Sequence, residues 1–161
     1  MEIHWNSMKN IVKTLNRLNE IGNSLPEEIV AIYLFGSSIT GRLRVESDID
    51  IAILPSYRTT NDERLVLISK VESIITKLLG EKNIRREVNI VNLRDRFLAL
   101  TLQYRIITEG ILLYEKDRVE RIEFENGVKG EYFDFAPYIS LFRKKKYGDL
   151  HEKVRTHRGV S

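Results

Sequence analysis

The chain has 161 residues, of which 42% are hydrophobic and 30% charged, so it is long enough for one domain with a hydrophobic core and too short for two ordinary domains. The absence of cysteine excludes disulfides, cysteine metal sites and thiol catalysis, and no apolar run reaches the roughly 18 residues that a membrane-spanning helix needs. A formal net charge of +3 is modestly basic, which suits a nucleotide, a nucleic acid or an acidic protein partner and is equally compatible with an ordinary solvated surface.

The first third of the chain predicts a helix followed by two strands. Apolar residues spaced three and four apart indicate a helix over residues 5–21. An uninterrupted apolar run then predicts a buried strand from Ile29 to Phe35, which stops at Gly36. Ser37 is expected to open a short helix, and a second strand follows from Asp48 to Leu54.

The rest of the chain as far as residue 114 alternates between helix and strand. Four elements are predicted: a helix from an N-cap at Asn61 or Asp62 to Gly80, a strand over 84–91, a helix over 95–108 with Phe97 in its apolar stripe, and a strand over 111–114. The first of these helices joins two strands and is expected to cross the sheet. The fold class predicted is α/β, a small mixed sheet of about four strands with flanking helices.

Two carboxylates lie at the start of the second strand. Because side chains alternate between the faces of a strand, Asp48 and Asp50 point the same way while Ile49 points into the core. Like charges held side by side repel each other, and Mg²⁺, which prefers oxygen ligands, would offset them. Gly36 permits a tight turn, and a helix opened by Ser37 would offer backbone N–H groups to phosphate. The pattern therefore predicts a metal and triphosphate site for nucleotidyl transfer.

The spacing of these residues resembles a known signature. Gly36-Ser37, ten further residues and Asp48-x-Asp50 match the GS-x10-DxD pattern of the minimal nucleotidyltransferases of the DNA polymerase β superfamily. Ser47 completes their usual SDID, and Gly41-Arg42 matches the glycine and basic residue that usually follow the first motif. Within the superfamily the chain most resembles the MntA-like antitoxins, which are paired with HEPN toxins.

This resemblance implies a polymerase β-like nucleotidyltransferase fold and a role for each matching position. Asp48 and Asp50 would be catalytic and would bind the metal. The nucleotide would be bound by Gly36, Ser37, Ser38 and Arg42. Many relatives carry arginine in place of Ser38, so a phosphate contact there would be absent or taken over by Arg42 or Arg44.

The third strand departs from the family pattern at one position. Relatives carry a third catalytic Asp there, whereas this chain has Asn89. Glu87 lies on the same face of the predicted strand but is displaced by about 6.5 to 7 Å along it, further than its side chain spans. We therefore expect Asn89 to take the third catalytic position as a neutral ligand or hydrogen-bond donor, and catalysis to be slower than with three carboxylates.

Beyond residue 115 the pattern changes, which predicts a nucleotidyltransferase domain over residues 1–115 and a C-terminal extension over 116–161. Residues 132–138 interleave aromatic residues with one acid and are expected either to bind a partner or to fold back over the domain. The cationic run at 143–146 is expected to be solvated. The polar end that contains His151 and His157 is expected to be disordered and to bind no metal.

Two hypotheses of different classes follow. The resemblance implies an enzyme that uses ATP and Mg²⁺ to transfer AMP to a tyrosine hydroxyl of a cognate HEPN ribonuclease toxin. The alternative, which Asn89 favours, is a catalytically weak or inactive antitoxin that neutralises its toxin by binding. A drug-modifying nucleotidyltransferase is less favoured, because such enzymes usually add a helical substrate domain. We expect a cytoplasmic protein with no membrane partner and no direct nucleic-acid binding.

Overall fold

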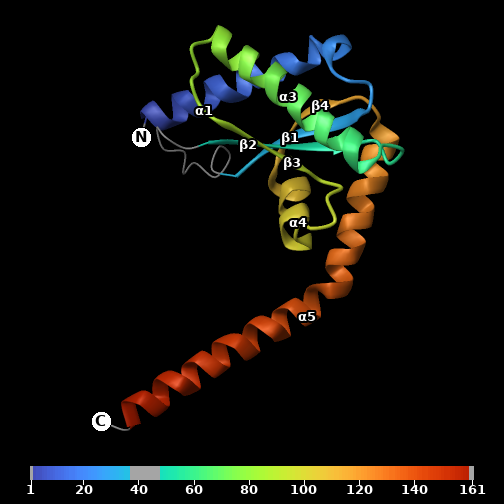
Figure 1. Ribbon diagram of the computed structural model, residues 1–161. Helices are drawn as coiled ribbons and strands as arrows, with labels where there is room; N and C mark the ends of the chain where they lie inside the picture. The colour runs from blue at the N-terminus through green and yellow to red at the C-terminus, as the bar shows by residue number, and fades with distance from the viewer. Residues whose placement is uncertain (1, 37–47, 160–161) are drawn as a thin grey trace.

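The computed structural model describes residues 2–36 and 48–159, and its centre is a four-stranded mixed sheet (Figure 1). The strands are β1 (Ile29–Phe35), β2 (Ile49–Pro55), β3 (Val88–Asn92) and β4 (Ile111–Glu115), in the order β3-β2-β1-β4. β1 pairs antiparallel with β2 and β4, whereas β3 runs parallel to β2. The predicted fold class is therefore confirmed.

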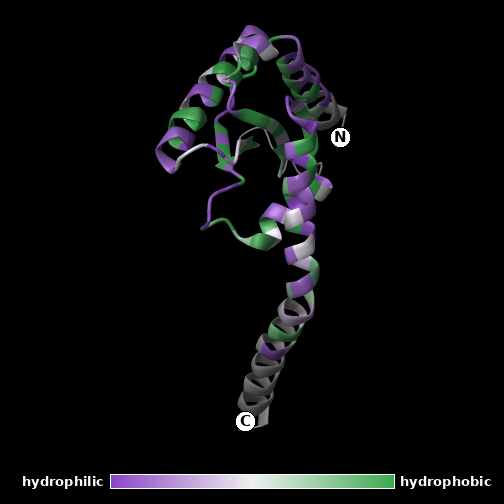
Figure 2. Ribbon diagram, turned by 90° about the vertical axis from the view of Figure 1, so that its right-hand side faces the viewer, coloured by the Kyte–Doolittle hydropathy of each residue, from purple (hydrophilic) through white to green (hydrophobic). Residues whose placement is uncertain are grey.

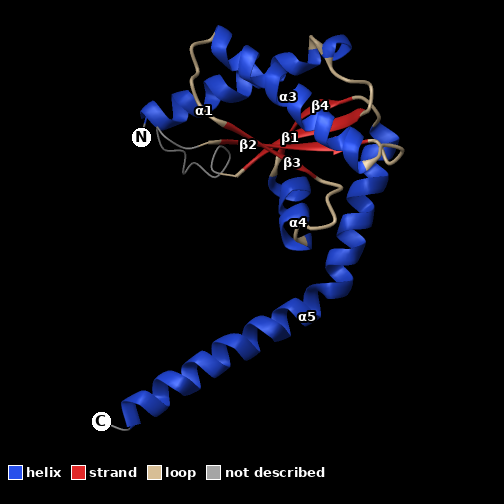
Figure 3. Ribbon diagram, viewed as in Figure 1, coloured by secondary structure: helices blue, strands red, loops and turns tan. Residues whose placement is uncertain are grey.

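Helices α1 (Glu2–Leu15) and α3 (Asn61–Glu81) cover one face of the sheet (Figure 3). Two short 3₁₀ helices, η1 (Asn16–Asn19) and η2 (Gly22–Ser24), join α1 to β1. The core between helices and sheet is aliphatic, and its fully buried members include Ile11, Leu15, Ile32, Leu34, Ile49, Ile51, Ile53, Val71 and Ile75. Figure 2 shows the strands in green between helices whose colours alternate, as expected for amphipathic helices around an apolar sheet.

Helix α4 (Leu100–Glu109) and the start of α5 (Arg118–Gly159) cover the opposite face. A second cluster fills this side, with Tyr33, Ala52 and Leu54 from the sheet packed against Ile106 of α4 and Phe124 of α5. Alternate residues of β1 and β2 thus supply both cores, which is why these strands read as continuous apolar runs.

Helix α5 has 42 residues, and none of them was predicted to be helical. Its charged sequence has little periodicity, and Pro137 lies inside it. The prediction of a disordered C-terminus is wrong as far as Gly159. The second half of α5 leaves the domain and runs beneath α4 in both Figures 1 and 2. No helix in the described ranges is long and apolar enough to cross a membrane.

Polar contacts fasten the start of α5 to the sheet. Tyr33, only 2% exposed in the middle of β1, donates its hydroxyl to Glu125 Oε1 at 2.7 Å. Burial, reinforced by the neighbouring Glu125, raises the pKa of Tyr33, so the phenol stays neutral and remains a donor. Arg121 ion-pairs with both Glu115 and Glu125. The base of α5 is therefore fixed by buried, paired groups.

Several predicted boundaries differ from the observed ones for local reasons. α1 ends at Leu15 rather than at 21. The side-chain amide of Asn19 donates a hydrogen bond to the backbone carbonyl of Asn16, and such local bonds compete with a continuing helix. The N-cap of α3 is Thr60, not Asn61 or Asp62, since Thr60 and Glu63 form a reciprocal capping box.

The third strand and the helix after it are both shorter than predicted. β3 begins at Val88 rather than at 84, because its neighbour β2 begins opposite it at Ile49 and the described chain offers no earlier strand to pair with. α4 begins at Leu100 rather than at 95, because Asp95 accepts the Phe97 amide through its side chain at 2.9 Å and forms a turn. Phe97 is consequently 82% exposed rather than in an apolar stripe.

Candidate active site

Asp48 and Asp50 lie where β2 begins, on the face of the sheet covered by α4. Their neighbours Ile49 and Ile51 are fully buried on the other face, so strand alternation directs both carboxylates toward the α4 side, as predicted. Both carboxylates are half-buried. The first residues of β2 thus hold two like charges in partly desolvated surroundings.

Asn89 lies next to this pair because β2 and β3 are parallel and in register. The register places Asn89 opposite Asp50 across the two strands. Its Nδ2 donates a hydrogen bond to Asp48 Oδ2 at 3.1 Å. Asn89 therefore touches one carboxylate and lies beside the other, at the position where the family pattern has a third acid.

The surroundings of Asp50 make its charged form costly. Burial is the main reason that the pKa of this carboxyl is raised; the amide of Asn89 lowers it, and the negative charge of Asp48 raises it further. Repulsion within a partly buried pair is relieved when a cation binds between the two groups. The local electrostatics are those of a site that gains stability from a positive charge.

The oxygen ligands present fit Mg²⁺. This ion takes one or two protein carboxylates and completes its shell with water and substrate phosphates. Asp48 and Asp50 supply that number, and the carbonyl oxygen of Asn89 is a further oxygen of the same kind. In the described ranges no group of three or more His, Cys, Asp or Glu side chains could hold a metal, so a richer protein cage is absent from those residues.

Gly36 follows β1 and approaches Asp50 closely. Its φ of +77° lies in the left-handed region, which favours glycine. A Cβ built on Gly36 would lie 2.3 Å from Asp50 Oδ2, well inside van der Waals contact. Only glycine leaves room for the Asp50 carboxylate against this turn, which explains why the residue belongs to the same motif as the acids.

The remaining predicted site residues divide into two groups. Ser37, Ser38 and Arg42 lie outside the described residues, so their predicted contacts to phosphate stay predictions. Glu87 is exposed, and its backbone carbonyl accepts the Ile49 amide at 2.8 Å, which places it before β3. The structure therefore brings Asp48, Asp50 and Asn89 together. The side chain of Glu87, two residues before Asn89, is exposed instead.

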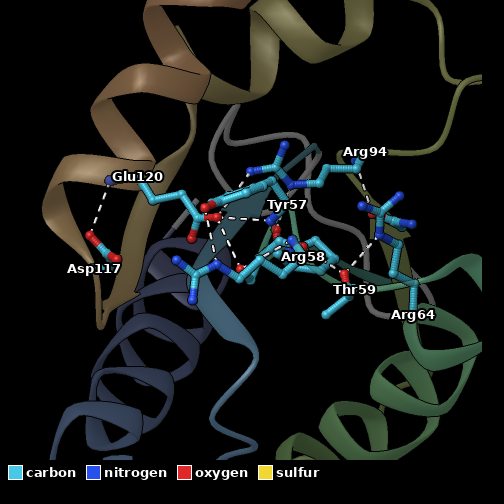
Figure 4. A network of polar contacts seen from close by, with 10 residues as sticks. Tyr57, Arg58, Thr59, Arg64, Arg94, Asp117 and Glu120 are labelled. Carbon is cyan, nitrogen blue, oxygen red and sulfur yellow. Dashed lines mark hydrogen bonds and ion pairs between the residues drawn. The ribbon is translucent and has the colours of Figure 1, made fainter.

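At the other end of β2 lies a polar network that sequence reasoning missed (Figure 4). Its centre is Glu120, which is 8% exposed and accepts the Ser56 hydroxyl at 3.1 Å and the Tyr57 amide at 2.8 Å. Arg94 lies 3.7 Å from the same carboxylate and donates to the carbonyl of Pro55. The sequence does contain one signal for part of this network, which is an N-cap at Asp117. The Asp117 side chain accepts the Glu120 backbone amide at 3.0 Å, as expected at the start of a helix.

Among protein families, the model described as "Polymerase beta, Nucleotidyltransferase" matches residues 16–119. Spectinomycin 9-adenylyltransferase of Staphylococcus aureus is 29% identical over 82 residues, which are 50% of this chain and 30% of that protein. The chain thus spans less than a third of the length of the curated relatives that it matches.

Two solved structures share the fold. A chain of a toxin–antitoxin complex crystallised with AMP-PNP has a TM-score of 0.52 and 26% identity, over 84% of this chain and 95% of the other. A chain of a mutant MntA–HpeT toxin–antitoxin complex has the same TM-score at 22% identity, over 85% and 96% of the two chains. The second likeness, at this identity, concerns the fold alone.

Proposed function

Since the chain belongs to the polymerase β nucleotidyltransferase family, we propose that it is an antitoxin that transfers AMP from ATP to a tyrosine hydroxyl of a helical toxin of the HEPN kind. The observation that carries this proposal is the half-buried pair Asp48 and Asp50, held against Gly36 and beside Asn89. The likeness to a toxin–antitoxin complex with AMP-PNP supports the choice of nucleotide and partner. The adenylyltransferase relative supports the group transferred.

Asp48 and Asp50 would hold Mg²⁺, whose charge would offset the negative charge that builds up on the phosphates during transfer. Asn89 positions the Asp48 carboxylate through its hydrogen bond and offers a neutral oxygen beside it. The turn at Gly36, together with the predicted contacts of Ser37, Ser38 and Arg42, would bind the phosphates. The cytoplasm, which supplies both ATP and Mg²⁺, is the expected compartment.

The transfer forms one bond and breaks another. The tyrosine oxygen bonds to the α-phosphorus of ATP, the bond from that phosphorus to the leaving oxygen breaks, and pyrophosphate departs with the electron pair. The proton of the hydroxyl passes to solvent, because Asn89 is an amide and cannot accept it at neutral pH. Loss of a general base lowers the rate of proton removal, so we expect slow transfer.

Asn89 also favours a second candidate function. An antitoxin that merely covers its partner needs the fold and the surface but not a third carboxylate. In that case the complex forms equally well without ATP, and the toxin remains unlabelled. The two candidates therefore differ in one measurable product, AMP attached covalently to the partner.

The test uses the full chain and the protein encoded by the neighbouring reading frame. ATP labelled at the α-phosphate is incubated with both proteins and Mg²⁺, and the label on each is followed by gel and mass spectrometry; a parallel reaction supplies spectinomycin instead of the partner. We expect label on a tyrosine of the partner, lost on addition of EDTA. A stable complex with no label would establish the binding-only alternative, and label on spectinomycin instead of protein would replace the antitoxin proposal with drug modification.

A further inference from the structure

One face of α5 begins inside the domain and continues beyond it. Val128 is only 5% exposed and lies on the face of the helix that packs against the domain. Phe135 and Phe142 follow at successive intervals of seven residues, which keeps them on the same face of a helix. They are 54% and 71% exposed. The face that closes the core thus runs on into solvent as an apolar stripe.

The stripe is wide and aromatic. Tyr138 and Leu141, spaced three residues apart between the two phenylalanines, are 69% and 65% exposed. Just before the stripe, Tyr132 stacks on Tyr104 of α4 with centroids 3.7 Å apart and Phe133 lies edge-on to Tyr104 at 6.0 Å, and these are the ring-to-ring contacts with the domain among the described side chains of α5. We call residues 134–159 of α5 the arm.

The arm leaves the domain (Figure 1), and the described side chains of its apolar stripe are exposed, so packing on the domain does not stabilise this stripe. Most of the stability of a helix in a protein comes from the packing of its apolar face, and Pro137 and Gly148 both weaken the arm further. Exposed aromatic residues grouped on one face are typical of protein interfaces. The arm therefore has the properties of a surface that is completed by another chain.

Charge distinguishes between the possible occupants. From residue 143 to 159 the sequence has seven Lys or Arg and two Asp or Glu. A second copy of this chain, paired along the arm in either direction, would bring the basic run at 143–146 against itself, because that run lies near the middle of the arm. A partner with acidic residues beside an apolar face would be attracted instead.

The position of the arm relates its occupant to the carboxylates. Phe124 of α5 packs with Ala52 and Leu54 of β2. Asp50 lies on the same face of the sheet, because every second residue of a strand points to the same side. The arm continues from this face and runs beneath α4 (Figures 1 and 2). A chain packed against the arm's stripe would lie on the same side of the molecule as the site.

From these observations we propose that the arm is the docking surface for an acidic, helical partner protein and holds it on the face of the sheet that carries Asp48 and Asp50. This inference rests on the proposed function and names the surface through which that partner is recognised. It divides the predicted extension, residues 116–161, into a base that packs on the domain and an arm that binds.

The test compares a triple variant and a double variant of the full chain. Phe135→Ser, Tyr138→Ser and Phe142→Ser together remove the stripe. Leu65→Ser and Val66→Ser, on α3, are the matched control, because these residues are 66% and 53% exposed and lie on the far side of the sheet. Each protein is titrated with the partner encoded by the neighbouring reading frame, and Mg²⁺-dependent ATP binding is measured separately as a readout of the site.

We expect the stripe variant to bind the partner at least about a hundredfold more weakly, since buried aromatic residues dominate interface energy, and to bind ATP as the wild type does. The control should bind both normally. Lys145→Glu, at an exposed position, should weaken association more at low salt than at high salt.

Three outcomes would overturn the inference or its premise, and they are distinguishable. Unchanged partner affinity in the stripe variant would place the docking surface elsewhere while leaving the proposed function intact. A wild-type dimer that the stripe variant loses would show that a second copy covers the arm. Failure of the wild type to bind the partner at all would remove the proposed function, and the inference with it.

Discussion

The two ends of β2 differ in how their carboxylates are paired. At its start, Asp48 and Asp50 lie together with only the amide of Asn89 as a described hydrogen-bond partner. Beyond its end, the carboxylate of Glu120 faces Arg94 and accepts two further hydrogen bonds from the loop after the strand. The first end holds two negative charges together, whereas at the second end the negative charge of Glu120 is paired with the positive charge of Arg94.

This difference distinguishes a carboxylate that stabilises the fold from carboxylates arranged to bind a ligand. A buried charge that is paired and hydrogen-bonded holds elements together, as Glu120 does for α5 and the loop after β2. Two like charges without a cation destabilise the fold, and such an arrangement persists where a ligand completes it. The same strand therefore lies between a structural network at one end and the proposed active site at the other, and substitutions at its two ends should have opposite consequences.

Asp50→Asn should produce the largest loss of activity. We expect AMP transfer to fall by more than about a hundredfold, because the substitution removes half of the charge that would hold Mg²⁺. The free energy of unfolding in metal-free buffer should not fall, since a neutral amide relieves repulsion from Asp48. Labelled transfer and urea unfolding measure the two effects, with the exposed Glu72→Gln as control. Loss of stability together with activity would make Asp50 a structural residue.

Glu120→Ala should show the reverse pattern. The substitution leaves Arg94 half-buried without its carboxylate and removes acceptors from Ser56 and Tyr57. We expect the free energy of unfolding to fall by about 2 to 3 kcal/mol, measured by urea denaturation, while ATP binding by the folded fraction is retained. Glu123→Ala, on the exposed side of the same helix, should cost little. Equal losses in both variants would contradict the role assigned to the network.

Gly36→Ala tests how closely the turn and the acid are fitted. A β-carbon at this positive φ, in the space now occupied by Asp50 Oδ2, should cost about 1 to 2 kcal/mol of stability. Displacement of the carboxylate should also lower transfer by roughly tenfold. Gly80→Ala is the control, since nothing lies within 4 Å of the position that its Cβ would take and helix propensity predicts a small gain. Unchanged activity in Gly36→Ala would separate the turn from the site.

Asn89→Asp should have the smallest effect. It adds a third negative charge beside Asp48 and Asp50, at the start of β2. We expect transfer to the partner to rise several-fold at saturating Mg²⁺, because a third carboxylate strengthens metal binding and can accept the hydroxyl proton. Without metal, stability should fall by about 1 kcal/mol from added repulsion and the lost bond to Asp48. Glu87→Ala should change transfer little. Abolition of transfer by Glu87→Ala would identify Glu87 as the third acid.

Much of the sheet and the acid pair could be predicted from sequence because local rules determine them. The apolar runs at Ile29–Phe35 and Ile49–Pro55 are too long and too regular to be surface segments. The alternation of Asp48, Ile49 and Asp50 fixes which face each side chain takes. These features depend on residues within a few positions of one another.

What could not be predicted depends on distant partners. Tyr33 and Glu125 are separated by 92 positions, and Asn89 reaches Asp48 across 41 only because β3 is parallel to β2. Helix α5 was missed because its glycines, a proline and a dense mixture of charges hide its period. Ser37, Ser38 and Arg42 stay predictions, since they lie outside the described residues.

The fastening of α5 also has a mechanical consequence. Glu120 secures the helix at the Pro55 end of β2, while the carboxylates occupy the other end of this seven-residue strand, about 20 Å away. A load applied along the arm, by a partner that binds or dissociates, would first reach the contacts at the base of α5, which are the Glu120 network, the Tyr33–Glu125 hydrogen bond and the Arg121 ion pairs. Because Asp48 and Asp50 lie at the opposite end of β2 from Glu120, we expect a partner bound to the arm to shift on it with little effect on the geometry of the two carboxylates.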